Sequence, residues 1–234
     1  MHPLMVIPCL IASLAMTRAE ARRGQVQIWF EQLGSPDQHA RTQAKRELMG
    51  LHAEELPMLR QIVAAAAPLR AAQIDPLHEA FDYIYVRHQL QKLPRTTGGF
   101  LGLTLPGAFD EPFGNPNREP ASGVEVSRLP GFAAYRFLED GDIIRGISQA
   151  GELKPIRTST ELKQIVSALS PGEDVTIHIQ RGAADVTVRF PLDAAPVAND
   201  VNESLNLFAS TQNAQNEAAG FWEEAFLPLI LPAP

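Results

Sequence analysis

Residues 98–103 read Gly-Gly-Phe-Leu-Gly-Leu, and four more short runs follow in order: GVEV at 123–126, LEDGDII at 138–144, SPGEDV at 170–175 and RG at 181–182. Around these runs, valine, isoleucine and phenylalanine alternate with polar residues, a pattern typical of half-buried β-strands. Residues 175–180 and 185–192 match a β-hairpin with its turn at 181–184. A helical pattern covers residues 159–169. The sequence therefore predicts a small β-rich domain with one helix.

In this order, the runs resemble a PDZ domain of the bacterial, circularly permuted kind found in HtrA-type proteases and other envelope proteins. The resemblance covers residues 96–193. It implies an α+β fold class, in which an α-helical region precedes a PDZ-like small β-barrel or sandwich with a groove-flanking helix. It also implies that this domain captures a protein C-terminus or an extended peptide by strand addition.

The resemblance places a carboxylate-binding loop at residues 99–102. Backbone N–H groups of Phe100, Leu101 and Gly102 would converge on the ligand carboxylate, because a glycine-bearing turn can hold an anion without a charged side chain. The strand at residues 101–105 would offer a free edge to the peptide, and an apolar last side chain would enter a pocket beside the helix. The candidate peptide-binding residues are Gly99, Phe100, Leu101, Gly102, Leu103, Thr158, Glu161, Ile165 and Leu169.

An insertion at residues 106–122 interrupts the PDZ-like pattern. It is acidic, contains Pro106, Pro112, Pro116 and Pro120, and directly follows the strand of the carboxylate-binding loop. The insertion would either shield the groove or add specificity for ligand residues further from the terminus.

Residues 22–94 form a predicted α-helical region. Apolar residues recur at helical spacing in four runs, and Ser35 with Pro36 predicts the start of the second helix, Ser35 being its N-cap. Paired helices of this kind weakly resemble HEAT or armadillo repeats. A small helical cap packed on the PDZ-like domain is the alternative. Pro94 and the glycine pair at 98–99 mark the boundary to the next domain.

The N-terminal residues 1–21 are predicted to be a signal peptide. An apolar run at residues 4–16 is too short to span a bilayer as a stable helix, and a small-x-small pattern follows at residues 19–21. An uncleaved anchor and a wrongly assigned start codon are the alternatives. Cys9, the only cysteine, lies in this run and lacks the flanking residues of a lipidation signal. The mature chain would therefore carry no thiol and no disulfide.

Residues 194–234 are predicted to combine a flexible linker with an apolar C-terminal segment. The part up to Glu217 is rich in Asn, Gln, Ser and Ala, and this composition offers little apolar area to offset ordering entropy. Residues 221–231 are apolar enough to require burial, on the same protein or on a partner.

Composition and motifs argue against several other functions. The 234 residues carry a net charge of −7, which gives no broad basic field for nucleic acid. Histidines such as His178 lack metal-ligand spacing, and Asp140 and Asp142 lack the remaining ligands of a calcium loop. We expect no metal and no cofactor. No Gly-x-Ser-x-Gly motif occurs, and the helical region is too short for a trypsin-like double barrel, so we expect no enzyme activity.

These observations together predict an exported protein of the periplasm or cell envelope that acts as a non-catalytic peptide-binding adaptor or regulatory protein. It would have no stable membrane span once mature. One alternative is a structural scaffold in which the helical region makes the functional contact and the groove is self-occupied. Another is a partner that presents substrates to a separate envelope protease.

Overall fold

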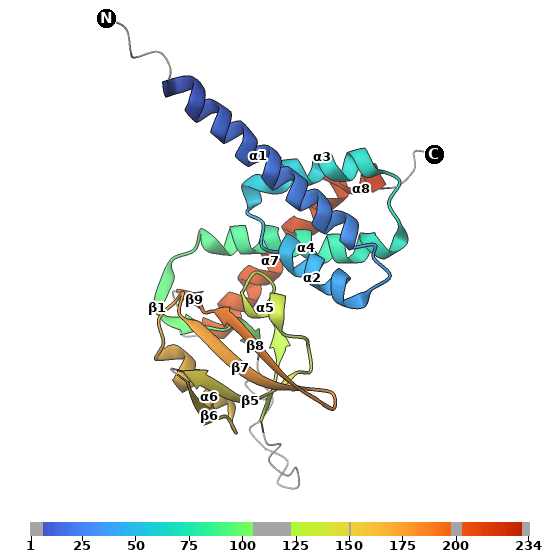
Figure 1. The fold of residues 1–234 in the computed structure, drawn as a ribbon. Coiled ribbons are helices and arrows are strands. Elements are labelled where there is room, and N and C mark those ends of the chain that lie inside the picture. The colour runs from blue at the N-terminus through green and yellow to red at the C-terminus, as the bar shows by residue number, and fades with distance from the viewer. Residues whose placement is uncertain (1–6, 105–122, 150, 198–202, 231–234) are drawn as a thin grey trace, which may run out of the picture. The chain divides into compact units, whose positions relative to one another are not determined.

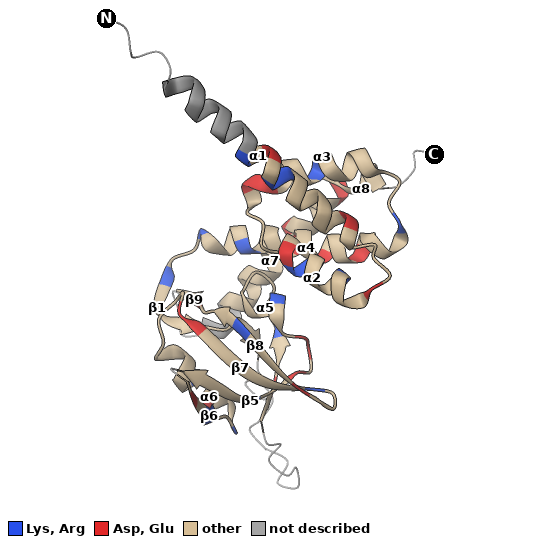
Figure 2. Ribbon diagram, viewed as in Figure 1, with Lys and Arg blue, Asp and Glu red and all other residues tan. Residues whose placement is uncertain are grey.

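The computed structural model describes residues 7–104, 123–149, 151–197 and 203–230, and their side chains from residue 18 onward except those of residues 203–206. The chain belongs to the α+β class, and its N-terminal helices precede the strands. It divides into two units. Unit 1 comprises Met1–Ile84 and Ala219–Pro234, and unit 2 comprises Tyr85–Ala218. In the view of Figure 2, basic and acidic residues are interspersed within each unit rather than gathered by sign.

Unit 1 is α-helical (Figure 1). It contains α1 (Ile7–Gln32), α2 (Gln38–Leu48), the 3-10 turn η1 (Ala53–Glu55), α3 (Leu56–Ala66), α4 (Ala71–Gln91) as far as Ile84, the end of α7 (Glu203–Ala225) and α8 (Leu227–Ile230). The four predicted helical runs are confirmed, since Phe30, Leu48, Leu59 and Phe81 are all fully buried. Their resemblance to helical repeats stays a prediction.

The start of α2 differs from the prediction. Asp37, not Ser35, is the N-cap, and its carboxylate accepts the N–H of His39 at 2.9 Å. The Ser35 hydroxyl instead accepts the N–H of Asp37 at 3.2 Å. Both residues are good helix-start residues, and the one nearer to the first turn takes the cap.

The predicted signal peptide overlaps the beginning of α1. Residues 1–6 and the side chains of residues 7–17, Cys9 among them, lie outside the described part of the chain. Within the described part, no helix is both long and apolar enough to cross a membrane.

The predicted flexible linker is wrong for most of its length. Asp193–Pro196 forms strand β9, and α7 runs over Glu203–Ala225. In α7, Thr211, Ala214, Ala218 and Trp222 are buried, so every third or fourth residue faces inward. The buried residues of the stretch up to Glu217, Thr211 and Ala214, are small and add little to a hydrophobicity count, which explains why the composition suggested disorder.

The apolar C-terminal segment packs on the chain's own helical unit. The Trp222 ring stacks on His78 at 4.5 Å and on Phe226 at 5.1 Å between centroids, and Phe226 lies 5.0 Å from Phe81. The Arg60 Nε donates to the carbonyl of Ala225 at 3.0 Å. Residues 231–234 lie outside the described part.

Unit 2 contains the β-strands, arranged in three sheets among the described residues (Figure 1). The largest has the order β3 (Val124–Glu125), β5 (Ile143–Gln149), β7 (Asp174–Arg181) and β8 (Ala184–Pro191), with β6 (Glu152–Pro155) also paired to β5; β1 (Arg95–Phe100) pairs with β9, and β2 (Leu103–Thr104) pairs with β4 (Ser127–Arg128). All pairs are antiparallel. The described strands do not close into a barrel.

The predicted hairpin and helix of unit 2 are confirmed. Strand β7 pairs with β8 in a register that sets Arg181 opposite Ala184. Helix α6 spans Ser159–Ser167, and α5 spans Ala134–Phe137. Alternate residues of the hairpin, including Ile177 and Phe190, enter one apolar core with Leu162 and Val166 of α6. This core positions the two walls of the predicted groove.

Candidate functional site

The candidate carboxylate-binding loop connects β1 to β2. Gly102 has φ of +74°, a left-handed conformation that glycine adopts without strain. Its carbonyl accepts the N–H of Leu129 at 2.9 Å. Within the part of the chain that the structure describes, the N–H groups of Leu101 and Gly102 have no backbone acceptor. Both residues are buried, and the binding of an anion by their N–H groups stays a prediction.

The preceding glycine pair has a packing role. The N–H of Gly99 donates to the carbonyl of Leu169 at 2.7 Å, so this N–H is already satisfied. A Cβ on Gly99 would lie 2.7 Å from the carbonyl oxygen of Val166, and one on Gly98 would lie 2.9 Å from that of Ser167. The pair lets β1 approach the C-terminal end of α6. Gly99 therefore contributes no free N–H to the candidate loop.

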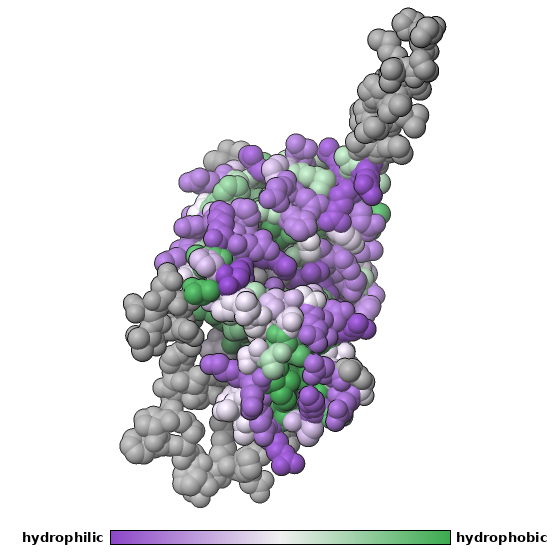
Figure 3. Space-filling view, turned by 90° about the vertical axis from the view of Figure 1, so that its left-hand side faces the viewer, coloured by the Kyte–Doolittle hydropathy of each residue, from purple (hydrophilic) through white to green (hydrophobic). Residues whose placement is uncertain are grey.

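Helix α6 was predicted to form the other wall of the candidate site. Leu162, Val166 and Leu169 are buried in the core, as predicted. Ile165 is half-buried and packs against the same core, and Phe100 and Leu103 are half-buried as well. On the face drawn in Figure 3, apolar side chains form a narrow stripe flanked by polar ones, over the strand-bearing part of the molecule.

Thr158 and Glu161 form a capping box at the start of α6. The Thr158 hydroxyl accepts the N–H of Glu161 at 3.2 Å, and the Glu161 carboxylate accepts the N–H groups of Thr158 at 3.2 Å and Arg157 at 2.8 Å. A Thr-x-x-Glu spacing before an apolar run signals this motif. Both side chains therefore cap the helix, and their role in peptide binding stays a prediction.

Strand β2 is shorter than the predicted edge strand. It covers Leu103–Thr104, and residues 105–122, which include the predicted insertion at 106–122, lie outside the described part. One edge of β2 pairs with β4, with Leu103 opposite Arg128. Its other edge has no strand partner among the described residues. That edge is where an added peptide strand would pair.

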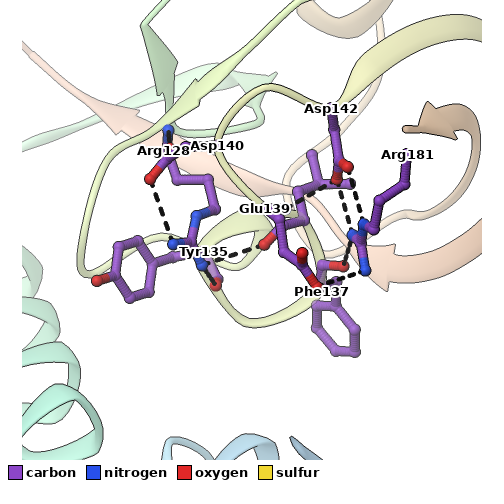
Figure 4. Close-up of polar contacts among 8 residues, drawn as sticks. Arg128, Tyr135, Phe137, Glu139, Asp140, Asp142 and Arg181 are labelled. Carbon is purple, nitrogen blue, oxygen red and sulfur yellow. Dashed lines mark hydrogen bonds and ion pairs between the residues drawn. The ribbon is translucent and has the colours of Figure 1, made fainter. Parts of the chain in front are cut away.

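Arg128 fixes β4 against the loop that follows α5 (Figure 4). Its Nη1 donates to the carbonyls of Tyr135 at 3.0 Å and Leu138 at 3.1 Å, and its Nη2 contacts Asp140 at 3.3 Å. The guanidinium also lies over the Tyr135 ring at 4.4 Å. Burial opposes ionisation of Asp140, but hydrogen bonds from the backbone and side chain of Arg128 outweigh it, so the pKa of Asp140 is lowered.

Arg181 holds the same loop from the hairpin side (Figure 4). Its Nε and Nη2 bind the two carboxylate oxygens of Asp142 at 2.8 and 2.7 Å, and its Nη1 binds Glu139 at 2.7 Å. Asp142 is buried, with a side chain only 1% exposed. The hydrogen bond to Asp142 raises the pKa of Arg181. Asp140 and Asp142 thus serve arginines rather than a metal.

No sequence pattern predicted the residues that pack against the loop at residues 100–102. Phe132 is buried, and its ring lies 5.0 Å from that of Phe100 in an edge-to-face arrangement. A Cβ on Gly102 would come within 2.9 Å of Phe132 Cδ2 and closer still to its Cβ and Cγ. The N–H of Ala133 donates to the Asp193 carboxylate. These contacts join residues far apart in the chain, and no local sequence pattern announces them.

One serine–histidine pair lies on the largest sheet. Ser148 Oγ is 2.7 Å from His178 Nε2, and the hydroxyl of Thr187 is 3.4 Å from Nδ1. A catalytic triad needs a carboxylate at Nδ1 to orient the imidazole, and a hydroxyl occupies that place. Among the described residues, no group of three or more His, Cys, Asp or Glu is placed to hold a metal ion.

A cavity of about 270 Å³ is present in unit 1. Its lining residues are Arg23, Gln27, Phe30, Glu31, Ile62, Ala65 and Ala66. They come from α1 and α3, and none of them is a predicted peptide-binding residue.

Comparison with known proteins gives one informative relative. A probable periplasmic serine endoprotease DegP-like from Pseudomonas fulva (strain 12-X) is 26% identical over 151 residues. The match covers 62% of this chain but only 29% of that protein, so the chain spans less than a third of the relative's length. No protein-family model matches the chain. The similarity supports a relationship to HtrA-type proteins, in agreement with the PDZ-like order of motifs.

Proposed function

We propose that residues 96–193 form a PDZ-like module that binds the C-terminus or an extended segment of another protein. The observation that carries this proposal is that the N–H groups of Leu101 and Gly102 have no backbone acceptor among the described residues. Their loop leads directly into an edge of β2 that has no strand partner in the same part of the chain. Backbone donors in a turn suit a terminal carboxylate, and an open edge suits strand addition.

The half-buried Phe100, Leu103 and Ile165 favour an apolar last side chain in the ligand. Burying one aliphatic side chain contributes roughly 1.5–3 kcal/mol, and each strand hydrogen bond contributes about 1 kcal/mol. The cost of association consumes much of this sum. We expect a dissociation constant near the micromolar range, or about −8 kcal/mol.

We further propose that the protein acts without catalysis, as an adaptor or as a partner that presents substrates to a separate protease. In support, the serine–histidine pair on the sheet has a hydroxyl where a triad needs its acid. The similar protein is described as periplasmic, and we extend that location to this chain. In the scaffold alternative the groove is self-occupied. The C-terminal segment is a poor occupant, because its aromatic residues pack on α4 within unit 1.

The test is binding of a C-terminal peptide library to the full chain, with every peptide offered as a free acid and as an amide. Selective capture of peptides with free, apolar C-termini supports the proposal. Equal capture of the amidated set would argue against a carboxylate-binding loop. Capture of no peptide would favour the scaffold alternative, in which the helical unit makes the functional contact.

A further inference from the structure

Asp193 lies directly behind the candidate loop. It is the β9 partner of Phe100 in the β1–β9 ladder, and its carboxylate accepts the N–H of Ala133. Asp193 is thus 60 residues away in the sequence from Ala133, whose N–H it accepts. A charge-assisted hydrogen bond to a backbone N–H is among the stronger ones in proteins, so Asp193 fixes the position of Ala133.

Fixing Ala133 also fixes its neighbour, Phe132. The Phe132 side chain fills the space that a Cβ on Gly102 would need, and its ring meets that of Phe100 edge to face. The N–H of Leu129 holds the Gly102 carbonyl from the same segment. We name residues 129–133 the backing segment. The backing segment contacts Phe100 and Gly102, the residues on either side of Leu101. These contacts limit the directions in which the N–H groups of the loop can point.

Asp193 is surrounded by three arginines in a buried setting. Burial raises the pKa of Asp193, and the hydrogen bond from Ala133 and the charges of Arg87, Arg95 and Arg136 oppose this rise without cancelling it. These arginines come from α4, β1 and α5 respectively. Arg95 Nη1 also donates to the carbonyl of Ala194 at 2.7 Å, which ties β1 to β9 beside Asp193.

We propose that Asp193 is the positioning residue of the carboxylate-binding loop: by holding the N–H of Ala133 it keeps Phe132 pressed on Gly102, and this contact orients the Leu101 and Gly102 donors toward a peptide carboxylate. The inference rests on the proposed function. It adds a residue that touches no ligand and yet sets the preference for a free C-terminus over an amidated one.

The test compares Asp193→Ala with Asp193→Asn in the full chain. The probe is a fluorescent peptide ending in valine, as a free acid and as an amide. We expect Asp193→Ala to bind the free acid about tenfold more weakly, equivalent to about 1.4 kcal/mol, with affinity for the amide unchanged. Asp193→Asn should bind nearly as the wild type does, because its amide oxygen still accepts the N–H of Ala133.

The matched control is Asp174→Ala. Asp174 pairs with Arg189 at 3.0 Å on the exposed surface of the same unit, so losing this pair removes an Asp–Arg contact without touching the loop. A merely structural role for Asp193 would weaken binding of the acid and the amide by the same factor. That outcome, or an Asp193→Asn variant as impaired as Asp193→Ala, would overturn the assignment.

A second measurement separates the inference from the proposed function. Amide hydrogen exchange by NMR, without peptide, reports on Ala133, Leu101 and Gly102. We expect faster exchange at Ala133 and altered rates at the two loop amides in Asp193→Ala, and wild-type rates in Asp193→Asn. Unchanged exchange in Asp193→Ala would refute the positioning role. If exchange changes but the wild type does not distinguish acid from amide, the proposed function fails and the loop contact stands.

Discussion

Replacing Gly102 by alanine tests the geometry of the candidate loop most directly. Gly102 has φ of +74° and Gly141 has φ of +85°, yet a Cβ on Gly141 would meet nothing within 4 Å. The left-handed conformation costs an alanine roughly 1–2 kcal/mol at either position. A methyl group at position 102 would also collide with the Phe132 side chain, whereas one at position 141 would meet no neighbouring atom. Gly141→Ala is therefore the matched control.

The collision sets the expected difference between the two variants. Forcing an extra methyl group into a packed site typically costs about 1–3 kcal/mol. We expect Gly102→Ala to be about 2 kcal/mol less stable than Gly141→Ala, because conformational strain and the lost freedom of the unfolded chain are common to both and cancel. For a chain of this length, that corresponds to a difference of roughly 4–8 °C in Tm.

The assay is urea unfolding followed by circular dichroism, combined with a double-mutant cycle. Phe132→Gly in the Gly102→Ala background removes both the ring and the Cβ that the new methyl group would meet, so we expect a favourable coupling energy of about 1–3 kcal/mol. Peptide binding should weaken in Gly102→Ala and persist in Gly141→Ala. Equal stability of the two alanine variants, or zero coupling with Phe132, would refute the reasoning.

Three further changes have defined outcomes. Arg181→Met leaves the buried carboxylate of Asp142 without its ion pair and should lower the free energy of unfolding by about 3 kcal/mol, as urea midpoints would report. The folded-state pKa of Asp140 is lowered. Its ionised carboxylate therefore stabilises the fold above the unfolded pKa of about 3.9, and this stabilisation is lost as pH falls through the folded pKa. The urea midpoints at pH 7 and pH 3 should differ less in Asp140→Asn than in the wild type. Trp222→Ala removes a nearly buried ring that stacks on Phe226 and should cost about 3–5 kcal/mol, measured by thermal unfolding; an unchanged Tm would show that the C-terminal segment does not hold unit 1.

The secondary structure around the candidate site was predictable because each element follows local rules. Alternation of apolar and polar residues located the β7–β8 hairpin, and helical spacing located α6 with Leu162 and Val166 inward. The loop that contains Gly102 was expected from its glycines, and Gly102 does adopt a positive φ. Each of these features depends on residues within a few positions of one another.

Other expectations were incomplete because a residue type fits more than one role. A glycine can serve an anion-binding turn or a close approach, and Gly99 serves the second by donating to Leu169. Thr158 and Glu161 belong to a capping box, whose Thr-x-x-Glu spacing was readable from the sequence. The polar stretch before residue 217 is helical in α7, since its inward residues are small rather than strongly apolar.

The sequence by itself determined the β7–β8 hairpin with its turn, helix α6 and the inward-facing residues of both, because periodicity and backbone preference act over short distances. Only the tertiary structure decided what stands behind the loop. Phe132 reaches Gly102, and Asp193 reaches Ala133, through folding of the whole unit. Contacts between residues so far apart arise from packing and burial, which no run of neighbouring residues encodes.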